Sequence, residues 1–352
     1  MAASSERPTL RTIADLTGLA VTTVSRALLD APQIALETRQ RVQQVAREVG
    51  YQPDRAAQHL RTGRTNVISF VLDPHDELLG FSTSMIRGLT HALRDTQYHL
   101  VITPHFAETP AIEPIRYILR NRMADGVVFS RTEPFDPRVE LLLENDFPFI
   151  SHGRTNLPDP HPFVDYDNAA FSSLAVRRLV AKGRKRLALI LPSDRFTFHQ
   201  HLRDGFLAAA RELGVACELP SDINLDSSTT DLSAWLRWRL SEPAAPDGIV
   251  CAGEVSALSI MAALSDQGLC VGEDLDLVVK QTSRLYDEVR PRVDAVYEDI
   301  AQAGELLGQL LIRRIAGEDP AGLRHLQAPA PRFAESHKQP MQPAPASGVR
   351  PQ

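Results

Sequence analysis

The stretch Leu10–Leu28, with the sequence LRTIADLTGLAVTTVSRAL, decides how the N-terminal part of this chain folds. Apolar residues recur at helical spacing on both sides of Gly18, which predicts two short helices joined by a tight turn. Gly18 can adopt the positive φ that this turn needs, and Ala14 is small where the helix axes would cross. The apolar positions are Ile13, Ala14 and Leu16 before the glycine and Leu19, Val24 and Leu28 after it.

The second predicted helix carries short hydroxyls and one cation near its start, on the face that its apolar residues leave free. These residues are Thr22, Thr23, Ser25 and Arg26. Such a face suits a helix that enters a DNA major groove by its N-terminal end. An ordinary pair of antiparallel helices with a polar surface has the same spacing, so the spacing alone leaves both interpretations open.

Two motifs in this order resemble the headpiece of the LacI/GalR family of bacterial transcription regulators. The first motif spans 9–26 and the second spans 51–60, and the pair at this separation is highly specific. A weaker resemblance of residues 66–330 to the effector domain of the family extends the match over most of the chain. The matching residues are Thr9, Ile13, Ala14, Thr17, Gly18, Leu19, Thr23, Val24, Ser25 and Arg26 in the first motif and Tyr51, Pro53, Asp54, Ala57 and Leu60 in the second.

The resemblance implies an all-α helix-turn-helix headpiece at residues 1–52 and a hinge helix within residues 53–64. In the family this hinge helix folds on the operator, pairs with its twin and inserts a leucine into the minor groove, a position that Leu60 holds here. A helix of about seven residues is too short to be stable alone in water, which agrees with folding on DNA. The alternative role for Leu60 is an anchor against its own domain. The expected DNA-binding residues are Thr9, Val21, Thr22, Thr23, Ser25, Arg26, Tyr51, Arg55, Ala57 and Leu60, of which Val21 suits a thymine methyl.

Capping signals bound the helices of the headpiece. Thr9 is expected to cap the first helix through its hydroxyl. At Ala20, where the family commonly has a capping serine, no side-chain acceptor is present, so we expect a weaker start or a cap made by the backbone. A third helix is predicted from about Leu36 to Val49, with Gly50 ending it.

The charge of the chain is unevenly distributed. The 352 residues carry a net charge of −6, are 43% apolar and 23% charged, and are enough for more than one domain. Residues 1–64 hold nine arginines and six acids, a net charge of +3, which leaves −9 for the remainder. Such asymmetry is typical of a small nucleic-acid module on an acidic carrier. A charge of +3 is modest, so two copies side by side would bind phosphate much better than one.

The composition favours a cytoplasmic protein. The first twenty residues lack an apolar run of signal-peptide length, and no stretch approaches 18 consecutive apolar residues, so we expect neither secretion nor a membrane role. Cys217, Cys251 and Cys270 show no metal-ligand spacing and fit a reducing compartment as small core residues. We therefore expect no metal and no cofactor.

From Asn66 onward, short apolar stretches alternate with helical ones, which predicts parallel sheets covered on both faces. The predicted strands are 67–73, 99–104, 126–130, 148–153, 186–192, 248–253 and 276–280. The predicted helices are 81–94, 113–121, 139–145, 168–182, 201–213 and 254–267.

The resemblance implies that this part is a periplasmic-binding-protein-like effector domain of two doubly wound α/β subdomains with a cleft between them. The first subdomain is expected at 65–165 and 294–318, and the second at 166–293 and 319–333. The chain would cross between them three times, with 295–317 returning to the first. The end of the chain from Ala328 is rich in Pro, Gln and Ala without periodicity, and the predicted disordered tail is 334–352.

Ligands of open α/β sheets bind beyond the carboxyl ends of the strands, where polar side chains bind hydroxyls and an aromatic ring covers an apolar face. The resemblance implies a sugar- or purine-type effector there. Arg154 is the favoured single residue because its guanidinium binds paired oxygens in bidentate fashion, and a plain surface salt bridge is the alternative. The effector-binding candidates are Asp73, Phe81, Arg154, His199, His201, Arg203, Glu254 and Gln281.

The cleft sequence departs from the usual pattern of the family. Leu202 stands where the family usually has arginine, Gly253-Glu254 replaces Asn-Asp, and residues 280–282 read KQT in place of Gly-[Phe/Tyr]-Asp. The strings HGRT (152–155) and KQTS (280–283) look like those of a branch that responds to sugars such as α-glucosides. We therefore expect a sugar as the effector.

The leading hypothesis is a homodimeric repressor that binds an inverted-repeat operator and whose DNA affinity changes when a small molecule closes the cleft. One alternative is an enzyme on a doubly wound scaffold, and another is a sugar-binding protein without a DNA role. The sequence has no G-x-G-x-x-G, G-x-x-x-x-G-K-[ST], G-x-S-x-G or H-E-x-x-H motif, which counts against the enzyme. The helical N-terminal module counts against the binding protein.

Overall fold

The computed structural model describes residues 8–52, 63–73, 77, 79–106 and 108–333. The chain divides into two compact units, Met1–Asn66 and Val67–Gln352, which we call the headpiece and the body and describe separately. The predicted hinge residues Arg55, Ala57 and Leu60 lie outside the described residues, and so does the predicted tail at 334–352.

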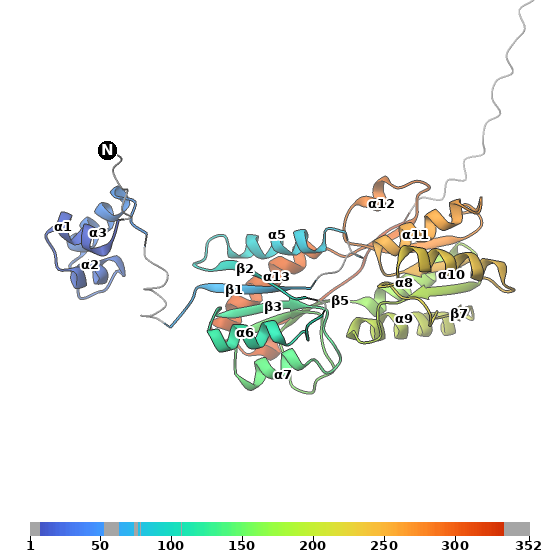
Figure 1. Ribbon diagram of the computed structural model, residues 1–352, viewed down its shortest axis with the longest axis horizontal. Coiled ribbons are helices and arrows are strands. Elements are labelled where there is room, and N and C mark those ends of the chain that lie inside the picture. Colours follow the sequence, from blue (N-terminus) through green and yellow to red (C-terminus); the bar gives the residue numbers. More distant parts are fainter. Residues whose placement is uncertain (1–7, 53–62, 74–76, 78, 107, 334–352) are drawn as a thin grey trace, which may run out of the picture. The chain divides into compact units, whose positions relative to one another are not determined.

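The headpiece contains three helices around a small core (Figure 1). They are α1 (Leu10–Thr17), α2 (Val21–Leu28) and α3 (Leu36–Glu48). The core consists of short apolar side chains, which lets helices of this length approach closely. Its buried members are Ile13, Ala14, Val24, Ala27, Val42 and Ala46.

The caps of the headpiece helices follow the sequence. The Thr9 hydroxyl accepts a hydrogen bond from the Thr12 backbone N at 3.3 Å, and Gly18 has a φ of 70° at the end of α1. The start of α2 has no side-chain cap, and the Ala20 carbonyl instead accepts from the backbone N atoms of Thr23 and Val24. The absence of a side-chain cap agrees with the sequence, and of the first backbone N–H groups of α2 the Thr23 N–H is bonded by the backbone.

The first subdomain of the body is built on a parallel sheet with the strand order β11-β5-β4-β3-β1-β2. Helices α5 (Phe81–Leu93) and α13 (Ile300–Ile315) cover one face of this sheet, and α6 (Glu113–Asn121) and α7 (Pro137–Glu144) cover the other (Figure 1). The strands are β1 (Val67–Leu72), β2 (His99–Pro104), β3 (Gly126–Ser130), β4 (Phe149–His152), β5 (Phe163–Tyr166) and β11 (Arg324–Gln327). Strand β3 is buried along its whole length because both of its faces are covered.

The second subdomain repeats this plan with the strand order β12-β10-β9-β8-β6-β7. All of its strand pairs are parallel except β12 with β10. The strands are β6 (Arg186–Ile190), β7 (Ala216–Glu218), β8 (Gly248–Cys251), β9 (Asp276–Gln281), β10 (Asp294–Tyr297) and β12 (Ala330–Arg332). The helices are α8 (Asn168–Ala181), α9 (Thr197–Leu213), α10 (Thr229–Ser241), α11 (Glu254–Ser265) and α12 (Leu285–Glu288), with a 3-10 turn at Pro320–Gly322.

The sheet pairing differs from the predicted subdomain ranges at the chain crossings. Asp294–Tyr297 pairs with β9 in the second sheet, so the return to the first subdomain begins only after this strand. Arg324–Gln327 pairs with β5 in the first sheet, and Ala330–Arg332, within the stretch without periodicity, pairs with β10. Both late strands lie at sheet edges and are mostly exposed, so they lack the apolar pattern that marks a buried strand. The three crossings themselves are present.

Glycines allow α5 and α13 to pack at close range. A Cβ on Gly88 of α5 would lie 2.1 Å from the Ala301 carbonyl oxygen, and one on Gly304 of α13 would lie 2.5 Å from the Met85 carbonyl oxygen. Both obstacles are backbone atoms, which cannot turn away as a side chain would. The two helices therefore approach each other at a distance that only glycine permits at these positions.

We expect Gly88→Ala to lower the free energy of unfolding of the full chain by about 1–3 kcal/mol, because the added methyl forces the two helices apart. Urea unfolding followed by circular dichroism measures this change. Gly322→Ala is the matched control, since its Cβ would meet only the Glu318 side chain at 4.0 Å. Equal stability of the two variants would contradict the packing argument.

Candidate functional site

The N-terminal half of α2 forms an exposed polar face on the headpiece. Val21 is 42% exposed, and Thr22 and Arg26 are exposed beside it. Thr23 and Ser25 are half-buried at the border of the same face, whereas Val24 turns into the core. This face has the apolar contact, the hydroxyls and the cation that a helix needs to bind base edges and phosphates.

Two other predicted DNA-binding residues have local structural roles. The Thr9 hydroxyl caps α1, although the residue is exposed. Tyr51 packs half-buried against the headpiece core, and its backbone N donates to the Ala46 carbonyl at 2.9 Å. Contacts of these two residues with DNA remain predictions.

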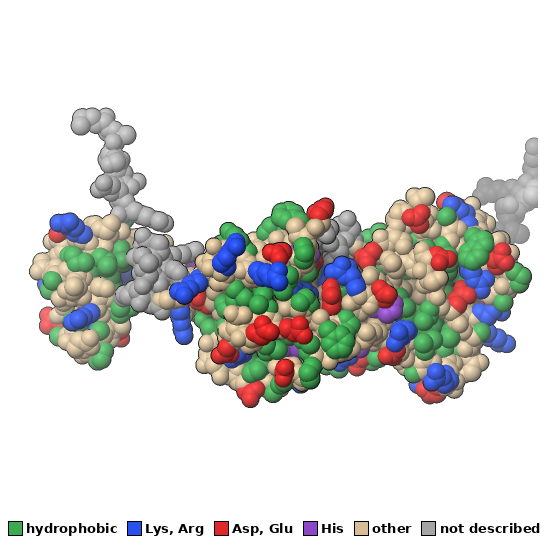
Figure 2. Space-filling view, turned by 60° about the horizontal axis from the view of Figure 1, so that its bottom comes forward, with side chains coloured by type: hydrophobic (Ala, Val, Ile, Leu, Met, Phe, Trp, Pro, Cys, Tyr) green, Lys and Arg blue, Asp and Glu red, His purple; other side chains and the backbone are tan. Residues whose placement is uncertain are grey.

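On the face drawn in Figure 2, acidic and basic side chains are interspersed over much of the body. Its basic run at 182–186 is engaged in ion pairs, since Lys182 and Arg184 both bind the Asp276 carboxylate. The charge pattern therefore favours the headpiece as the DNA-binding part of the chain.

The carboxyl ends of the two sheets face a cavity of about 80 Å³ in the body. Strand ends, the crossing segments and the start of α9 all contribute side chains to it. The lining is rich in paired charges, with aromatic rings between them. It includes Glu77, Phe81, Ser130, Arg131, His152, Arg154, Asp165, Asn168, Phe198, His201, Asp226, Lys280 and Glu298.

Arg154 bridges the two subdomains across this cavity. Its Nε lies 3.2 Å from Asp165 Oδ2, an ion pair without hydrogen-bond geometry, and donates to His201 Nε2 at 3.3 Å. Asp165 lies on β5 of the first sheet and His201 on α9 of the second subdomain. The Arg154 side chain is about a quarter exposed and belongs to the lining of the cavity.

The partners of Arg154 have strongly shifted pKa values. Burial raises the pKa of Asp165 to about 7, although the charge of Arg154 acts in the opposite direction. Burial and the charge of Arg154 lower the pKa of His201 to about 4. His201 is therefore neutral at neutral pH and can accept the hydrogen bond from Arg154.

A second cation of the cavity, Lys280, is buried and lies at the end of β9. Its Nζ is 2.9 Å from Glu298 Oε2 and donates to Asn168 Oδ1 at 3.2 Å. The same ammonium lies 5.2 Å from the Tyr166 ring centroid and 5.7 Å from that of Phe198. Lys280 is 4% exposed, so these partners replace the water that its charge would otherwise bind.

The start of α11 is capped from the opposite subdomain. The Glu77 carbonyl accepts from the backbone N atoms of Glu254 and Val255, and Glu77 Oε1 accepts from the Ser256 N at 2.8 Å. In return, the Glu254 carboxylate accepts from the Leu79 N at 2.7 Å. We call these contacts the α11 clasp. Gly253 makes room for it, because a Cβ there would lie 2.0 Å from Glu77 Oε1.

The structure brings together only some of the predicted effector-binding residues. Phe81, Arg154 and His201 line the cavity. Glu254 is fully buried in the α11 clasp and also binds the backbone N atoms of Thr282 and Ser283. The others do not appear in the lining: Asp73 pairs with His105, His199 Nδ1 bonds the Pro192 carbonyl, Arg203 is exposed and paired with Asp204, and Gln281 is buried.

Most residues of the cavity lining were not among the candidates, and of four charged or polar ones three follow a recognisable rule. Lys280 and Glu298 lie at or after the ends of β9 and β10, and Asn168 follows β5. Asp165 lies within β5 and carries no such signal. The short strands β5 and β10 were not predicted, so the sheet-edge rule could not be applied to them.

Two other kinds of site are absent from the part of the chain that the structure describes. No described helix is both long and apolar enough to cross a membrane. Among the same residues, no group of three or more His, Cys, Asp or Glu side chains is arranged to hold a metal ion.

Comparison with known proteins divides the chain in the same way. The family model "Bacterial regulatory proteins, lacI family" matches residues 9–54, and the model "Periplasmic binding protein-like domain" matches residues 176–335. The HTH-type transcriptional regulator AglR of Rhizobium meliloti (strain 1021) is 33% identical over 288 residues, which are 80% of this chain and 78% of that protein.

Solved structures show the same fold. The lac repressor dimer bound to operator and the anti-inducer ONPF aligns with a TM-score of 0.77 at 18% identity, covering 93% of this chain and 98% of that chain. A complex of the transcriptional regulator CelR with cellobiose aligns with a TM-score of 0.68 at 23% identity, covering 93% and 99%. The predicted fold class, a helix-turn-helix headpiece with two parallel-sheet α/β subdomains, is confirmed.

The raised pKa of Asp165 predicts a pH dependence of stability. The folded chain holds this proton up to about pH 7, whereas the unfolded chain releases it near pH 4. The carboxyl therefore lowers the free energy of unfolding as the pH rises from 4 to 7. Asp165→Asn should remove about 1–2 kcal/mol of this decline, measured by urea unfolding across the pH range. Parallel stability profiles of the two proteins would show that Asp165 titrates normally.

Proposed function

The chain belongs to the LacI family of bacterial regulatory proteins, and we propose that it is a homodimeric repressor whose affinity for an inverted-repeat operator is controlled by a sugar in the cleft of the body. Family membership makes the chain a DNA-binding transcriptional regulator and not an enzyme. The single observation that carries the rest of the proposal is the combination of an exposed α2 face with a polar cavity between two subdomains.

The proposed DNA contacts are made by α2. Arg26 and Thr22 are exposed on the face that would enter the major groove, and Val21 offers an apolar contact to a thymine methyl. The contacts of Thr9, Thr23, Ser25, Tyr51, Arg55, Ala57 and Leu60 are proposed from the family motif. Two headpieces related by two-fold symmetry would bind two half-sites, and this symmetry requires an inverted repeat.

A homodimer is supported by the edge of the first sheet. Strand β2 lies at this edge, and Val101 and Ile102 on it are 42% and 39% exposed. Phe106, which follows the strand, is 60% exposed. Open strand edges that carry apolar side chains favour pairing with another chain. A second copy would cover this edge and supply the second headpiece.

A neutral polyhydroxylated effector is supported by the chemistry of the cavity. Its fully buried cation, Lys280, already has the Glu298 carboxylate as a partner, so an anion would find little uncompensated positive charge there. Donors and acceptors lie beside the rings of Phe81 and Phe198, as in sites that bind sugar hydroxyls and an apolar sugar face. The HGRT and KQTS strings support an α-glucoside, and the CelR complex contains cellobiose.

The α11 clasp supports control by cleft closure. A cavity of about 80 Å³ is far below the 300–1,000 Å³ of typical small-molecule sites, so a sugar ring needs a wider separation of the subdomains than this arrangement has. Strand β1 begins at Val67, soon after the hinge segment, so a motion of the first subdomain reaches the hinge through the chain itself. The sugar would change DNA affinity by the difference in its binding to the two arrangements.

We expect the full chain to enrich an inverted repeat from a pool of random duplexes. Arg26→Ala should weaken binding to the enriched duplex by about 1–3 kcal/mol, because the cation contacts a base edge or a well-placed phosphate. Gel-shift titration measures the loss. Arg237→Ala, which removes an exposed arginine of α10, is the charge-matched control. An Arg26→Ala titration that overlays the control would remove Arg26 from the DNA contacts.

We expect at least one sugar of a panel that includes maltose and cellobiose to raise the unfolding midpoint of the full chain, since a ligand of the folded state stabilises by mass action. Arg154→Ala should lower the affinity for that sugar at least tenfold, because charge-assisted hydrogen bonds from the guanidinium are lost. Calorimetric titration measures both proteins, again with Arg237→Ala as the control. Unchanged affinity would exclude Arg154 from the sugar contacts, and a panel without any shift would count against a sugar effector.

A further inference from the structure

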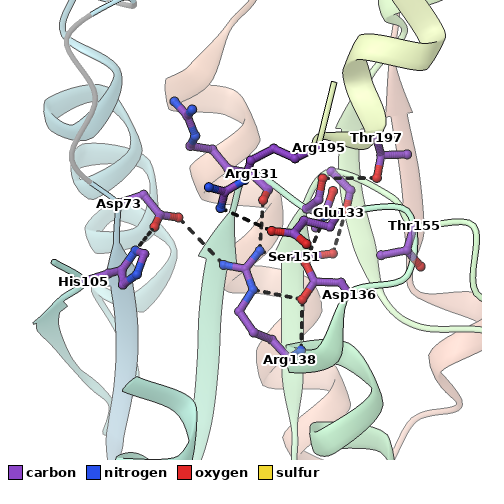
Figure 3. A network of polar contacts seen from close by, with 12 residues as sticks. Asp73, His105, Arg131, Glu133, Asp136, Arg138, Ser151, Thr155, Arg195 and Thr197 are labelled. Carbon is purple, nitrogen blue, oxygen red and sulfur yellow. Dashed lines mark hydrogen bonds and ion pairs between the residues drawn. The ribbon is translucent and has the colours of Figure 1, made fainter. Parts of the chain in front are cut away.

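A second, larger cavity lies beside the first in the body. It measures about 690 Å³, within the range of small-molecule sites, and shares Arg131 and Asp226 with the first cavity. Its walls come from the ends of β1, β2 and β3, the start of α7, and the segment after β6. Figure 3 shows the polar network at this place.

The floor of this second cavity is a fixed cation. Arg138 is 2% exposed, and its Nε and Nη2 donate to the two oxygens of Asp136 at 3.0 and 2.7 Å. Nη2 also donates to the Arg131 carbonyl at 3.0 Å, and the guanidinium lies 4.5 Å from the Phe129 ring centroid. The group therefore has one orientation, set before any ligand arrives.

The remaining nitrogen of this guanidinium faces an acceptor that lacks a hydrogen bond. Arg138 Nη1 is 3.8 Å from Asp73 Oδ2, too far for a hydrogen bond (Figure 3). Asp73 is nine-tenths buried and pairs with His105 through its other oxygen, while Oδ2 has no hydrogen-bond partner among the described residues. Oδ2 is itself shielded from solvent, so a ligand hydroxyl that accepts from Nη1 and donates to Oδ2 would have to displace the side chains that cover this oxygen.

The charge balance of the second cavity decides the class of ligand. Each of its guanidiniums has a carboxylate within 3.4 Å: Arg138 has Asp136, Arg195 has Glu133, and Arg131 has Asp226. A phosphate or carboxylate ligand would have to displace one of these acids. A neutral ligand with many hydroxyls keeps all three pairs and can bind the open donor and acceptor.

The partition between the two cavities is weak. The Arg131–Asp226 pair is 3.4 Å long, and its side chains are 20% and 45% exposed, so it contributes little free energy. Arg131 also has a φ of 56°, unusual for a residue other than glycine, and it stacks on Phe196 at 4.3 Å. The same two side chains belong to the lining of both cavities, so this pair is where the two cavities adjoin.

We propose that the second cavity is a further saccharide subsite, so that the effector is a neutral oligosaccharide with one ring near Arg154 and the next between Asp73 and Arg138. The inference rests on the proposed control by a sugar. It extends that proposal, because the second cavity would recognise the length of the sugar. It also assigns a role to Asp73, which the first cavity leaves unused.

The test compares glucose, maltose and maltotriose by calorimetric titration of the full chain, with cellobiose and cellotriose as the β-linked series. We expect affinity to rise at least tenfold from the single ring to the best longer sugar. Asp73→Asn and Arg195→Ala should each lower this ratio at least fivefold. Arg195 is half-exposed, so its variant keeps the test valid if Asp73→Asn does not fold. Asp95→Asn, at an exposed aspartate after α5, is the control and should keep the wild-type ratio.

The outcomes separate this inference from the function on which it rests. If sugars bind but affinity does not rise with length, or both variants keep the wild-type ratio, the second subsite is wrong and the sugar effector stands. If none of the five sugars binds, the proposed sugar control fails first. A rise with length that only the two variants reduce supports the subsite.

Discussion

The first turn of α11 is the constraint on which the arrangement of the body depends. A helix begins with backbone N–H groups that have no partner within the helix, and Gly253 offers no side chain to cap them. Glu77, from the opposite subdomain, accepts from three of these groups, those of Glu254, Val255 and Ser256. Opening the cleft therefore exposes the first backbone N–H groups of α11 to water, whereas closing it gives these groups hydrogen-bond acceptors on Glu77. The relative position of the subdomains is tied to hydrogen bonds that α11 needs in any case.

The charges inside the cleft depend on the same closure. Arg154 and Lys280 are held by partners from different elements, and the shifted pKa values of Asp165 and His201 arise because the closed subdomains exclude water. Burial likewise raises the pKa of Glu77 to about 7. Burying an ionisable side chain costs free energy. Ionisable side chains with shifted pKa values are therefore typical of binding and catalytic sites. A sugar that supplies hydroxyls to them would replace the water lost on closure.

Much of this architecture could be predicted from the sequence. The headpiece followed from helical spacing around Gly18, and most buried strands of the body followed from apolar runs such as VISFVL and GIVC. Among the strands that escaped prediction, Phe163–Tyr166, Asp294–Tyr297 and Arg324–Gln327 have four residues each, and their charged or polar residues break the apolar pattern. These strands lie next to the points where the chain crosses between subdomains. Because they were not predicted, the predicted subdomain boundaries are displaced.

The candidate site was harder to predict, because side-chain partners decide it. Arg154 and His201 were found from their places at the sheet edges. The same rule placed Glu254 in the cleft. Its carboxylate, however, accepts hydrogen bonds from the backbone N atoms of residues 282–283 and Leu79. Arg203 lies two residues from His201 on α9 and faces another direction, as helical geometry requires of an i, i+2 pair. Sequence spacing indicates which edge a residue occupies, and only the packing shows what it binds.

The claim that the cleft and the headpiece are coupled is tested most directly by measuring operator affinity with and without a saturating sugar, and sugar affinity with and without operator. We expect the sugar to change operator affinity at least fivefold and the operator to change sugar affinity by the same factor, as linkage requires. If the sugar leaves operator affinity unchanged and the operator leaves sugar affinity unchanged, the cleft and the headpiece are not coupled.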